Sequence, residues 1–132
     1  MTILETIVAK DVMIREIYTI HPENRVALAR LRMLRHGVGA LPVIDAKEKL
    51  LGIITLRDID LAGNEASALL IEDLMTTNLI TGNEDTSIAE ITAMVLQTGI
   101  QRIPIVDVDG KLIGLVTQTT IIRALKKFLE PT

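Results

Sequence analysis

The feature that most restricts the fold of this chain is an internal repeat with a constant spacing of 62 positions. The matched pairs are Asp11 and Asp73, Gly37 and Gly99, Pro42 and Pro104, Asp45 and Asp107, Gly52 and Gly114, and Thr55 and Thr117. Because no gap is needed between Asp11 and Thr55, the sequence is a tandem duplication of one structural unit. We therefore expect two motifs, residues 1–64 and residues 65–132, joined at Gly63-Asn64.

The residue pattern of each copy predicts the same order of elements, in which a β-hairpin lies between two helices. In the first copy we expect one or two helical turns at 3–9, a strand at 17–20, a helix at 24–36, hairpin strands at 41–44 and 50–54, and a helix at 56–62. In the second copy we expect a helix at 87–98, hairpin strands at 103–106 and 112–116, and a helix from 119 to 129 that Pro131 stops. Short β-branched runs around a polar turn are typical of a hairpin, and glycine after a helical apolar pattern ends the helix.

A small sheet with helices leaves one apolar sheet face uncovered, and two copies can cover these faces by packing them together. The sequence therefore predicts an α/β (α+β) fold in which two β-α-β-β-α motifs pack through their sheets with pseudo-two-fold symmetry. The side chains expected in the shared core are Ile44, Ile54, Val106 and Val116. This symmetry would create two equivalent clefts between the copies, and clefts of this kind commonly bind ligands.

The composition excludes several classes of function. The chain has 132 residues, of which 48% are hydrophobic and 23% charged, so it is expected to be globular. Aromatic residues make up 2% and the net charge is −3, so neither base stacking nor attraction to nucleic acid or an anionic membrane is expected. There is no apolar run of about 18 residues, no signal-peptide pattern and no cysteine, and His21 and His36 stand apart. We expect a cytoplasmic protein without a membrane span, a disulfide or a metal site.

Thr55 and Asp58 place a hydroxyl and a carboxylate three residues apart where the second hairpin strand runs into a helix. This spacing fits a capping box, in which the two side chains satisfy the first backbone amides of the helix. The same pair could bind a ligand, because a carboxylate accepts hydrogen bonds from two vicinal hydroxyls and a helix start favours a phosphate. Both interpretations stay open on spacing alone. In the second copy, Thr117 is followed by Thr120 where the acid should stand.

The order of elements and two phrases resemble the cystathionine β-synthase (CBS) motif. The phrases are Val38-Gly39-Ala40-Leu41-Pro42-Val43-Ile44-Asp45 and Gly52-Ile53-Ile54-Thr55-Leu56-Arg57-Asp58. Two copies in tandem look like a CBS pair, or Bateman module, and the resemblance extends from about Lys10 to Arg123. It implies a regulatory module rather than an enzyme. Such a module binds an adenosyl ligand (AMP, ADP, ATP or S-adenosylmethionine) between its motifs, passes the bound state to a partner protein, and commonly forms a homodimer.

The resemblance also implies which residues would line each cleft. Thr55 and Asp58 match the positions that hold phosphate and ribose. The rest of this first set would contact adenine or supply phosphate donors and cations: Ile53, Val38, Met75, Ile80, Ile100, Gln101, Arg102 and Arg57. The second set is Thr117, Thr120, Met13, Tyr18 and Leu115. We expect the second cleft to bind more weakly, because a hydroxyl replaces a charge-assisted acceptor at Thr120.

Several alternatives to a nucleotide sensor remain. The chain could be a dimerisation module with vestigial clefts, or a sensor of an S-adenosylmethionine-type ligand. An enzyme is disfavoured because no nucleophile or phosphate-gripping loop is visible.

A homodimer is expected from apolar stripes on two helices, formed by Ile59 and Leu61 and by Ile122 and Leu125. Arg25, Arg32 and Arg35 form a basic stripe that predicts a solvated face or a partner contact, and Arg102 could be the solvated end of a strand. His21 is interpreted as a turn residue and His36 as a helix C-terminal cation.

Overall fold

The computed structural model describes residues 2–130, which form two compact units. The first-copy unit is Tyr18–Leu79, and the second-copy unit combines the chain up to Ile17 with the chain from Ile80 onward. The segment that precedes each motif thus belongs to the compact unit of the other motif. The motif boundaries expected from the repeat, 1–64 and 65–132, stay a prediction, as does the packing of the two sheets against each other.

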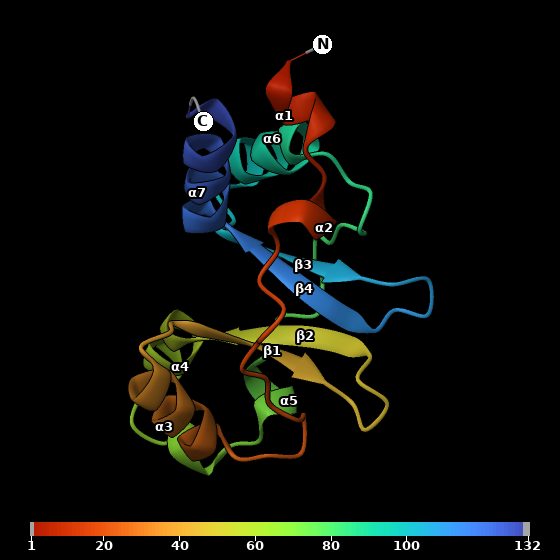
Figure 1. The fold of residues 1–132 in the computed structure, drawn as a ribbon. Helices are drawn as coiled ribbons and strands as arrows, with labels where there is room; N and C mark the ends of the chain where they lie inside the picture. The colour runs from red at the N-terminus through yellow and green to blue at the C-terminus, as the bar shows by residue number, and fades with distance from the viewer. Residues whose placement is uncertain (1, 131–132) are drawn as a thin grey trace. The chain divides into compact units, whose positions relative to one another are not determined.

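The first-copy unit is a two-stranded antiparallel hairpin with helices on one side (Figure 1). Its elements are α3 (Val26–His36), β1 (Ala40–Ile44), β2 (Leu50–Thr55), α4 (Leu56–Ala62), the 3₁₀ turn η1 (Ala66–Ala68) and α5 (Ile71–Leu74). Leu41 lies opposite Ile54 in the hairpin, and the register shifts between Val43 and Ile44. Gly37 ends α3 in the left-handed conformation with φ of 64°, which glycine adopts without a steric penalty.

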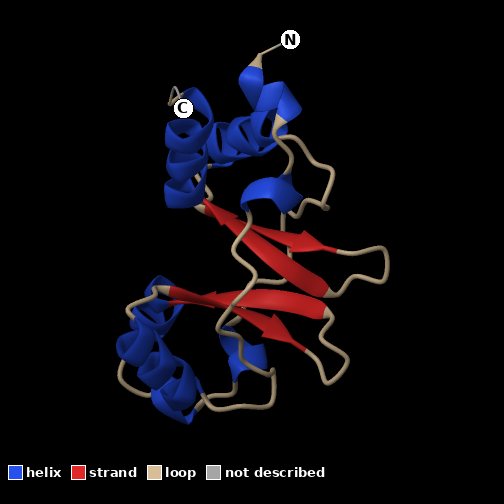
Figure 2. Ribbon diagram, in the orientation of Figure 1, coloured by secondary structure: helices blue, strands red, loops and turns tan. Residues whose placement is uncertain are grey.

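The second-copy unit repeats this architecture, with its own hairpin and helices (Figure 2). Its elements are α1 (Ile3–Thr6), α2 (Ala9–Val12), α6 (Ile88–Thr98), β3 (Arg102–Val106), β4 (Leu112–Thr117) and α7 (Gln118–Leu129). Ile103 lies opposite Val116, and the register shifts between Ile105 and Val106 as it does in the first hairpin. The mixed α/β composition and the two small sheets that the sequence predicts are confirmed.

Each hairpin is extended by a bridge to the segment that precedes the other motif. Thr76 pairs with Ile53 in β2, and Ile14 pairs with Leu115 in β4. A glycine next to each bridge makes this approach possible. A Cβ atom at Gly52 would lie 2.7 Å from the Thr76 carbonyl oxygen and 3.0 Å from the sulfur of Met75, and one at Gly114 would overlap the side chain of Met13. The glycines of the repeat therefore make room for a methionine-bearing segment.

Each unit has its own aliphatic core. The buried residues of the first-copy unit are Ile20, Val26, Ala29, Met33, Leu41, Val43, Ile54, Ile59, Ala66 and Ile71. Those of the second-copy unit are Ile7, Ala9, Met13, Ile88, Ile91, Val95, Ile103, Ile105, Val116 and Ile121. Side-chain volume is redistributed between equivalent positions, since Ala29 corresponds to Ile91 while Met33 corresponds to Val95. Equivalent core positions of the two copies therefore accommodate aliphatic side chains of different size.

Two of the four side chains predicted in the core are fully buried, and two are not. Ile54 and Val116 are completely buried, as expected, whereas Ile44 and Val106 are half-buried. Both exceptions lie at the register shift of their hairpin. A shift of this kind changes the direction of the side chain, so the alternation of inward and outward side chains along the strand no longer predicts burial there.

The strand predicted at 17–20 is wrong except at its last residue. Ile20 alone pairs with β1, through its amide to the Pro42 carbonyl at 3.1 Å and its carbonyl to the Ile44 amide at 2.9 Å. Thr19 is held by α3 instead, because the Arg32 guanidinium donates to its carbonyl oxygen at 2.6 Å. The Thr19 carbonyl thus hydrogen-bonds to a side chain of α3 and not to a neighbouring strand.

The basic stripe predicted on the first helix is only partly a solvated face. Arg32 bonds to Thr19, and Arg25 donates to the Ala68 carbonyl oxygen at 2.8 Å. Arg32 thus connects α3 to the segment before it, and Arg25, the N-cap of α3, connects the start of the helix to η1. Arg25 and Arg35 are exposed, whereas Arg32 is half-buried.

The apolar stripes predicted on the helices that follow the two hairpins, α4 and α7, were partly wrong. Ile59 is completely buried in the core of the first-copy unit, and Leu125 is half-buried.

Most element boundaries differ from the predictions by one or two residues. Helix α3 begins at Val26 rather than at residue 24, because the side chain of Asn24 accepts the His21 amide at 3.0 Å and forms a turn. Ser87 is the cap of α6 rather than its first residue, accepting the Glu90 amide at 3.1 Å. The helix predicted at 56–62 is confirmed as α4. The stop expected at Pro131 lies outside the described residues.

Within residues 2–130, no helix is long and apolar enough to cross a membrane.

Candidate functional site

Thr55 and Asp58 form the capping box that their spacing predicts. Strand β2 ends at Thr55, and α4 begins at the next residue. The Thr55 amide donates to Asp58 Oδ2 at 2.9 Å, and the Asp58 amide donates to Thr55 Oγ1 at 3.1 Å. This reciprocal pair satisfies two backbone donors at the start of the helix.

The capping box leaves part of both side chains available. It uses Oδ2 of the half-buried Asp58 and one lone pair of Thr55 Oγ1. Within the described part of the chain, Asp58 Oδ1 and the hydroxyl hydrogen of Thr55 make no hydrogen bond to another side chain or to the backbone. A carboxylate oxygen can accept a ligand hydroxyl and a threonine hydroxyl can donate to an anion, so capping and ligand binding are compatible here.

The equivalent residues of the second copy satisfy each other instead. The Thr120 amide donates to Thr117 Oγ1 at 3.1 Å, and the two hydroxyl oxygens lie 2.9 Å apart. One hydroxyl hydrogen is therefore used between the pair, and Thr120 is only 5% exposed. This pair offers no carboxylate and has fewer donors left for a ligand than the pair Thr55 and Asp58.

The first-copy unit also holds Ile53, Val38, Arg57 and Met75 from the first predicted set. Ile53 exchanges backbone hydrogen bonds of 2.9 Å with Thr76, the residue after Met75. The loop that carries Val38 is fastened to the start of α4, because the Gly39 carbonyl accepts the Leu56 amide at 2.9 Å. These bonds bring the loop, the end of β2 and the segment around Met75 to one region beside Thr55.

The other residues of the predicted sets are divided between the units. Ile80, Ile100, Gln101 and Arg102 of the first set belong to the second-copy unit. Thr117, Thr120, Met13 and Leu115 of the second set lie together in the second-copy unit, whereas Tyr18 belongs to the first-copy unit. The contribution of the separated residues to either site stays a prediction.

Tyr18 stacks on His36, a contact that sequence reasoning missed. The ring centroids lie 3.7 Å apart and the planes differ by 9°. Tyr18 was predicted to line a cleft and His36 to serve as a helix-end cation. The two residues are far apart in the sequence, and no local pattern links them.

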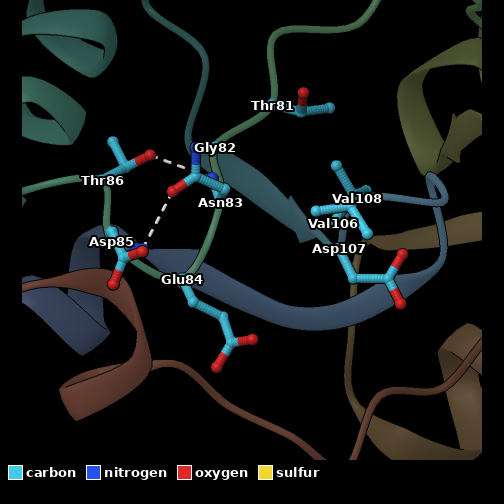
Figure 3. Close-up of a pocket in the computed structure, with 9 residues that line it drawn as sticks. All are labelled: Thr81, Gly82, Asn83, Glu84, Asp85, Thr86, Val106, Asp107 and Val108. Atoms are coloured by element: carbon cyan, nitrogen blue, oxygen red, sulfur yellow. Dashed lines mark hydrogen bonds between the residues drawn. The ribbon is translucent and has the colours of Figure 1, made fainter.

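A cavity of ≈ 620 Å³ in the second-copy unit was not foreseen (Figure 3). It is lined by the turn at 81–86 and by residues 106–108, and Glu84, Asp85 and Asp107 contribute carboxylates. The turn is ordered by its own side chains: Thr86 Oγ1 accepts the Asn83 amide, and Asn83 Oδ1 accepts the Asp85 amide, both at 2.9 Å. Among residues 2–130, no group of three His, Cys, Asp or Glu side chains could hold a metal ion.

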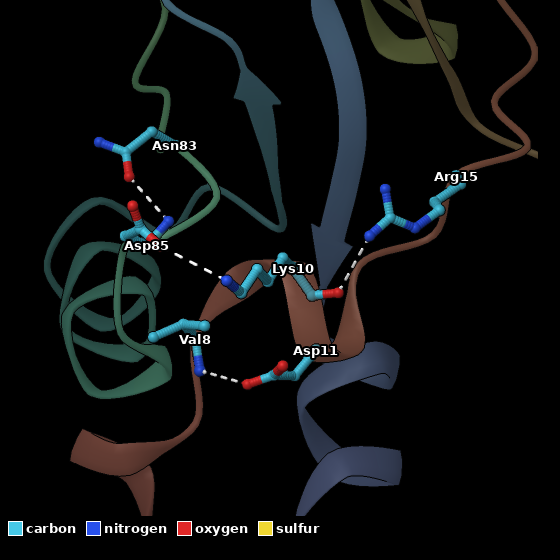
Figure 4. Close-up of polar contacts among 6 residues, drawn as sticks. All are labelled: Val8, Lys10, Asp11, Arg15, Asn83 and Asp85. Carbon is cyan, nitrogen blue, oxygen red and sulfur yellow. Dashed lines mark hydrogen bonds and ion pairs between the residues drawn. The ribbon is translucent and has the colours of Figure 1, made fainter.

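The N-terminal segment is attached to this turn by backbone hydrogen bonds and by one ion pair, between Lys10 and Asp85, which Figure 4 shows. Lys10 Nζ lies 3.9 Å from Asp85 Oδ1, and the Ala9 amide donates to the Thr86 carbonyl at 2.9 Å. Because both side chains of the ion pair are largely exposed, it contributes little stability. The N-terminal segment is therefore held mainly by the backbone of the turn, through the Ala9 amide to the Thr86 carbonyl and the Lys10 amide to the Glu84 carbonyl.

A second cavity, of ≈ 520 Å³, lies on the helical side of the first-copy unit. It is lined by Arg30, Met33 and Leu34 of α3, by the loop 37–39, and by Leu56 of α4. Most of this lining is apolar.

Comparison with known proteins places both copies in one family. The family model of the CBS domain matches residues 9–63 and 71–127. The inosine-5'-monophosphate dehydrogenase of Korarchaeum cryptofilum (strain OPF8) is 39% identical over 109 residues. These residues are 83% of this chain but 22% of that enzyme, so the chain spans about a fifth of the length of this relative.

Solved structures of CBS pairs have the same fold. The crystal structure of CBSX2, a CBS-pair protein from Arabidopsis thaliana, in complex with AMP is 27% identical, with a TM-score of 0.88 over 94% of this chain and 99% of that one. The CBS domain pair of protein MJ0100, in complex with 5'-methylthioadenosine and S-adenosyl-L-methionine, is 31% identical, with a TM-score of 0.80 over 92% of this chain and 97% of that one. The chain therefore belongs to the CBS domain family and carries its domain twice, as a tandem pair.

Proposed function

We propose that this chain is a regulatory module that binds an adenosine nucleotide, of the AMP, ADP or ATP class, at Thr55 and Asp58. The observation that carries the proposal is the pair of unused groups where β2 runs into α4: Asp58 Oδ1 as an acceptor and the Thr55 hydroxyl as a donor. An ionised carboxylate matches the hydroxyls of a ribose, and a hydroxyl donor suits a phosphate oxygen. The similarity to a CBS pair solved with AMP supports this class of ligand.

A phosphate beside Asp58 needs a nearby cation, because two negative charges repel each other. Arg57 is adjacent in the sequence and exposed on α4, and Arg102 is the second predicted cation. In this proposal Asp58 selects the ribose, the apolar side chains of Ile53, Val38 and Met75 contact the adenine, and the arginines favour a nucleotide over adenosine. The predicted contributions of Ile80, Ile100 and Gln101 belong to the same proposal.

Calorimetric titration with AMP tests this assignment. We expect about one strong site per chain, lost in Asp58→Ala and weakened roughly 10-fold in Asp58→Asn, which keeps an acceptor oxygen but loses the charge. Thr120→Ala, the matched change in the second copy, should leave the strong site unchanged.

The same titration separates binding from capping. Asp58→Ala also removes a helix cap worth about 1 kcal/mol, so its folding must be checked by circular dichroism and thermal melting. A folded Asp58→Ala variant that binds AMP with wild-type affinity would leave Asp58 as a cap only. The alternative of a dimerisation module with vestigial clefts would then be favoured.

An S-adenosylmethionine-type ligand is a second candidate, favoured by the similarity to the MJ0100 pair. This ligand has no phosphate and carries a positive sulfonium, so it would not need a cation beside Asp58. Arg102→Ala should weaken AMP and leave S-adenosylmethionine unaffected. Equal losses for both ligands would argue against a phosphate contact at Arg102.

The regulatory role implies that the bound state is transmitted. We propose a homodimer and a partner protein as the route of transmission, and we propose no catalytic activity for the pair itself. A ligand changes such an assembly only by binding its states with different affinity. Cytoplasmic location stays a prediction.

A further inference from the structure

Two turns that the repeat makes equivalent differ at one side chain. His21 in the first copy corresponds to Asn83 in the second, and each lies in the turn beside the end of a hairpin strand. The backbone around the two residues is hydrogen-bonded alike: the amides of Ile44 and Val106 each donate at 2.9 Å to the carbonyl of the residue before His21 or Asn83. The two positions can therefore be compared directly.

In the first copy, the imidazole ring of His21 occupies the space beside the end of β1. His21 is half-buried, and its Nδ1 lies 2.9 Å from the Ile44 carbonyl oxygen. Because a carbonyl oxygen can only accept a hydrogen bond, Nδ1 carries the hydrogen and donates it. The first copy thus supplies a planar N–H donor from its own chain at this position.

In the second copy, no side chain replaces this ring. Asn83 Oδ1 accepts the Asp85 amide at 2.9 Å instead (Figure 3). Among residues 2–130, no side chain donates to the Val106 carbonyl oxygen, the counterpart of the Ile44 oxygen. The cavity of ≈ 620 Å³ lies here, with the turn at 81–86 on one side and residues 106–108 on the other. The second copy therefore has a cavity at the position where the first copy has an imidazole.

The lining of this cavity is rich in acceptors and carries negative charge. Asp107 uses Oδ1 to accept two backbone amides of its own turn, which leaves Oδ2 for another donor. Glu84 makes no side-chain hydrogen bond or ion pair with another described residue, and the first copy has Pro22 at its position. Asp85 adds a third carboxylate, which has only the exposed, 3.9 Å contact with Lys10. These groups favour a cation that donates hydrogen bonds.

We propose that this cavity binds a small organic cation with a planar guanidinium head. The head donates to the Val106 carbonyl, as His21 donates to Ile44, and its remaining N–H groups face the carboxylates of Glu84 and Asp107. A guanidinium group suits this lining because it is planar, permanently charged and has five N–H donors. A metal ion suits it less, since the described residues bring no three His, Cys, Asp or Glu side chains together in a way that could hold one.

The proposed cation site is independent of the nucleotide proposal. The cavity belongs to the second-copy unit, whereas Thr55 and Asp58 belong to the first-copy unit. Either proposal can therefore fail without the other.

NMR titration with methylguanidinium at constant ionic strength tests the site. We expect the amide resonances of residues 83–86 and 106–109 to shift and to saturate. Tetramethylammonium has the same charge but no N–H donor, so it should leave these resonances almost unchanged. Equal shifts with both ions would mean general attraction of cations to an acidic surface and would overturn the proposed recognition. An absence of shifts with methylguanidinium would also overturn it.

Matched variants test the roles of the cavity and of its charge. Asn83→His should place a ring in the cavity as His21 does, and should weaken methylguanidinium binding about 10-fold or more. Glu84→Gln removes one carboxylate and should weaken binding several-fold, whereas Glu23→Gln makes the same charge change in the first copy and should have no effect. Thermal melting confirms that each variant is folded. Wild-type affinity in both folded variants, Asn83→His and Glu84→Gln, would overturn the assignment.

A reciprocal variant tests whether the imidazole of the first copy marks the position of a ligand group. His21→Asn combined with Pro22→Glu gives the first copy the two residues that distinguish the cavity of the second. This variant should gain a second set of saturable methylguanidinium shifts, at residues 21–24 and 44–46. A folded double variant without these new shifts would overturn the equivalence between the imidazole and the proposed cation.

Discussion

Gly52 and Gly114 occupy equivalent strand positions, and at each a methyl group would clash with the segment that pairs beside the strand. At Gly52 it would lie 2.7 Å from the backbone oxygen of Thr76 and 3.0 Å from the sulfur of Met75, and at Gly114 it would overlap the buried side chain of Met13 from its Cβ to its sulfur. At both positions a close atom belongs to the backbone or to the base of a side chain, so the neighbouring segment would have to shift. We expect Gly52→Ala and Gly114→Ala each to destabilise the protein by about 1–3 kcal/mol. Urea unfolding measures both values, and a variant as stable as the wild type would show that its neighbouring segment moves aside without cost.

At the same scale of single residues, the capping box at Asp58 leaves room for a ligand contact. The local sequence demands a cap, and the capping box is present. The cap does not compete with a ligand, because it engages one carboxylate oxygen and leaves the other. In the second copy, the hydroxyls of Thr117 and Thr120 hydrogen-bond to each other. The equivalent position of the repeat therefore has no carboxylate and has fewer hydrogen-bonding groups left for a ligand.

At the scale of the element, the turn of the first hairpin is stabilised by a charged side chain. Asp45 Oδ1 accepts the Lys47 amide at 2.8 Å and the Lys49 amide at 2.9 Å. The hydrogen bond from Lys49 is the main reason that the pKa of Asp45 lies below its ordinary value of 3.8; the Lys47 amide and both lysine charges lower it further, and desolvation opposes them. Because the folded pKa is depressed, the stabilisation is present above pH 3.8 and is lost as the pH falls through the folded value.

We therefore expect the amide resonances of Lys47 and Lys49 to shift together as the pH is lowered below 3.8. An NMR titration measures this transition. Asp45→Asn keeps the acceptor oxygen but has no carboxyl to titrate, so its transition should disappear. A transition that persists in Asp45→Asn would mean that another group titrates in the turn.

At the scale of the whole molecule, the exchange of N-terminal segments joins the two repeats. Ile7, Ala9 and Met13 belong to the core of the second-copy unit, and the Ile7 carbonyl accepts the Ile88 amide at 2.8 Å. In the same way, Ile71 belongs to the core of the first-copy unit. A motif cut from the chain at its sequence boundary would therefore lose part of its core.

A variant without residues 1–16 should lose stability mainly in the second-copy unit. It removes buried isoleucine and methionine side chains worth about 1.5–3 kcal/mol each. Native-state hydrogen exchange should show faster exchange in β3 and β4, with β1 and β2 less affected. Equal loss of protection in both hairpins would mean that the two units unfold as one cooperative body.

The sequence by itself was sufficient for features that depend on neighbouring residues. The two hairpins, the glycine stop of α3 and the bounds of α4 follow from turn residues, apolar periodicity and a capping box, all of which act within a few positions along the chain. The repeat likewise predicted the doubled motif, because duplication leaves a constant spacing that can be read directly.

Only the tertiary structure decided which distant groups meet. The sequence did not reveal that the chain up to Ile17 belongs to the second-copy unit, or that Tyr18 stacks on His36. It also did not reveal that the Thr19 carbonyl accepts a hydrogen bond from Arg32 and not from a strand. It also did not reveal that the hydroxyls of Thr117 and Thr120 hydrogen-bond to each other. Nor did it reveal that the capping bond from the Thr55 amide engages only Oδ2 of Asp58. These outcomes depend on competition among donors and acceptors brought together by folding, and periodicity along the chain carries no record of that competition.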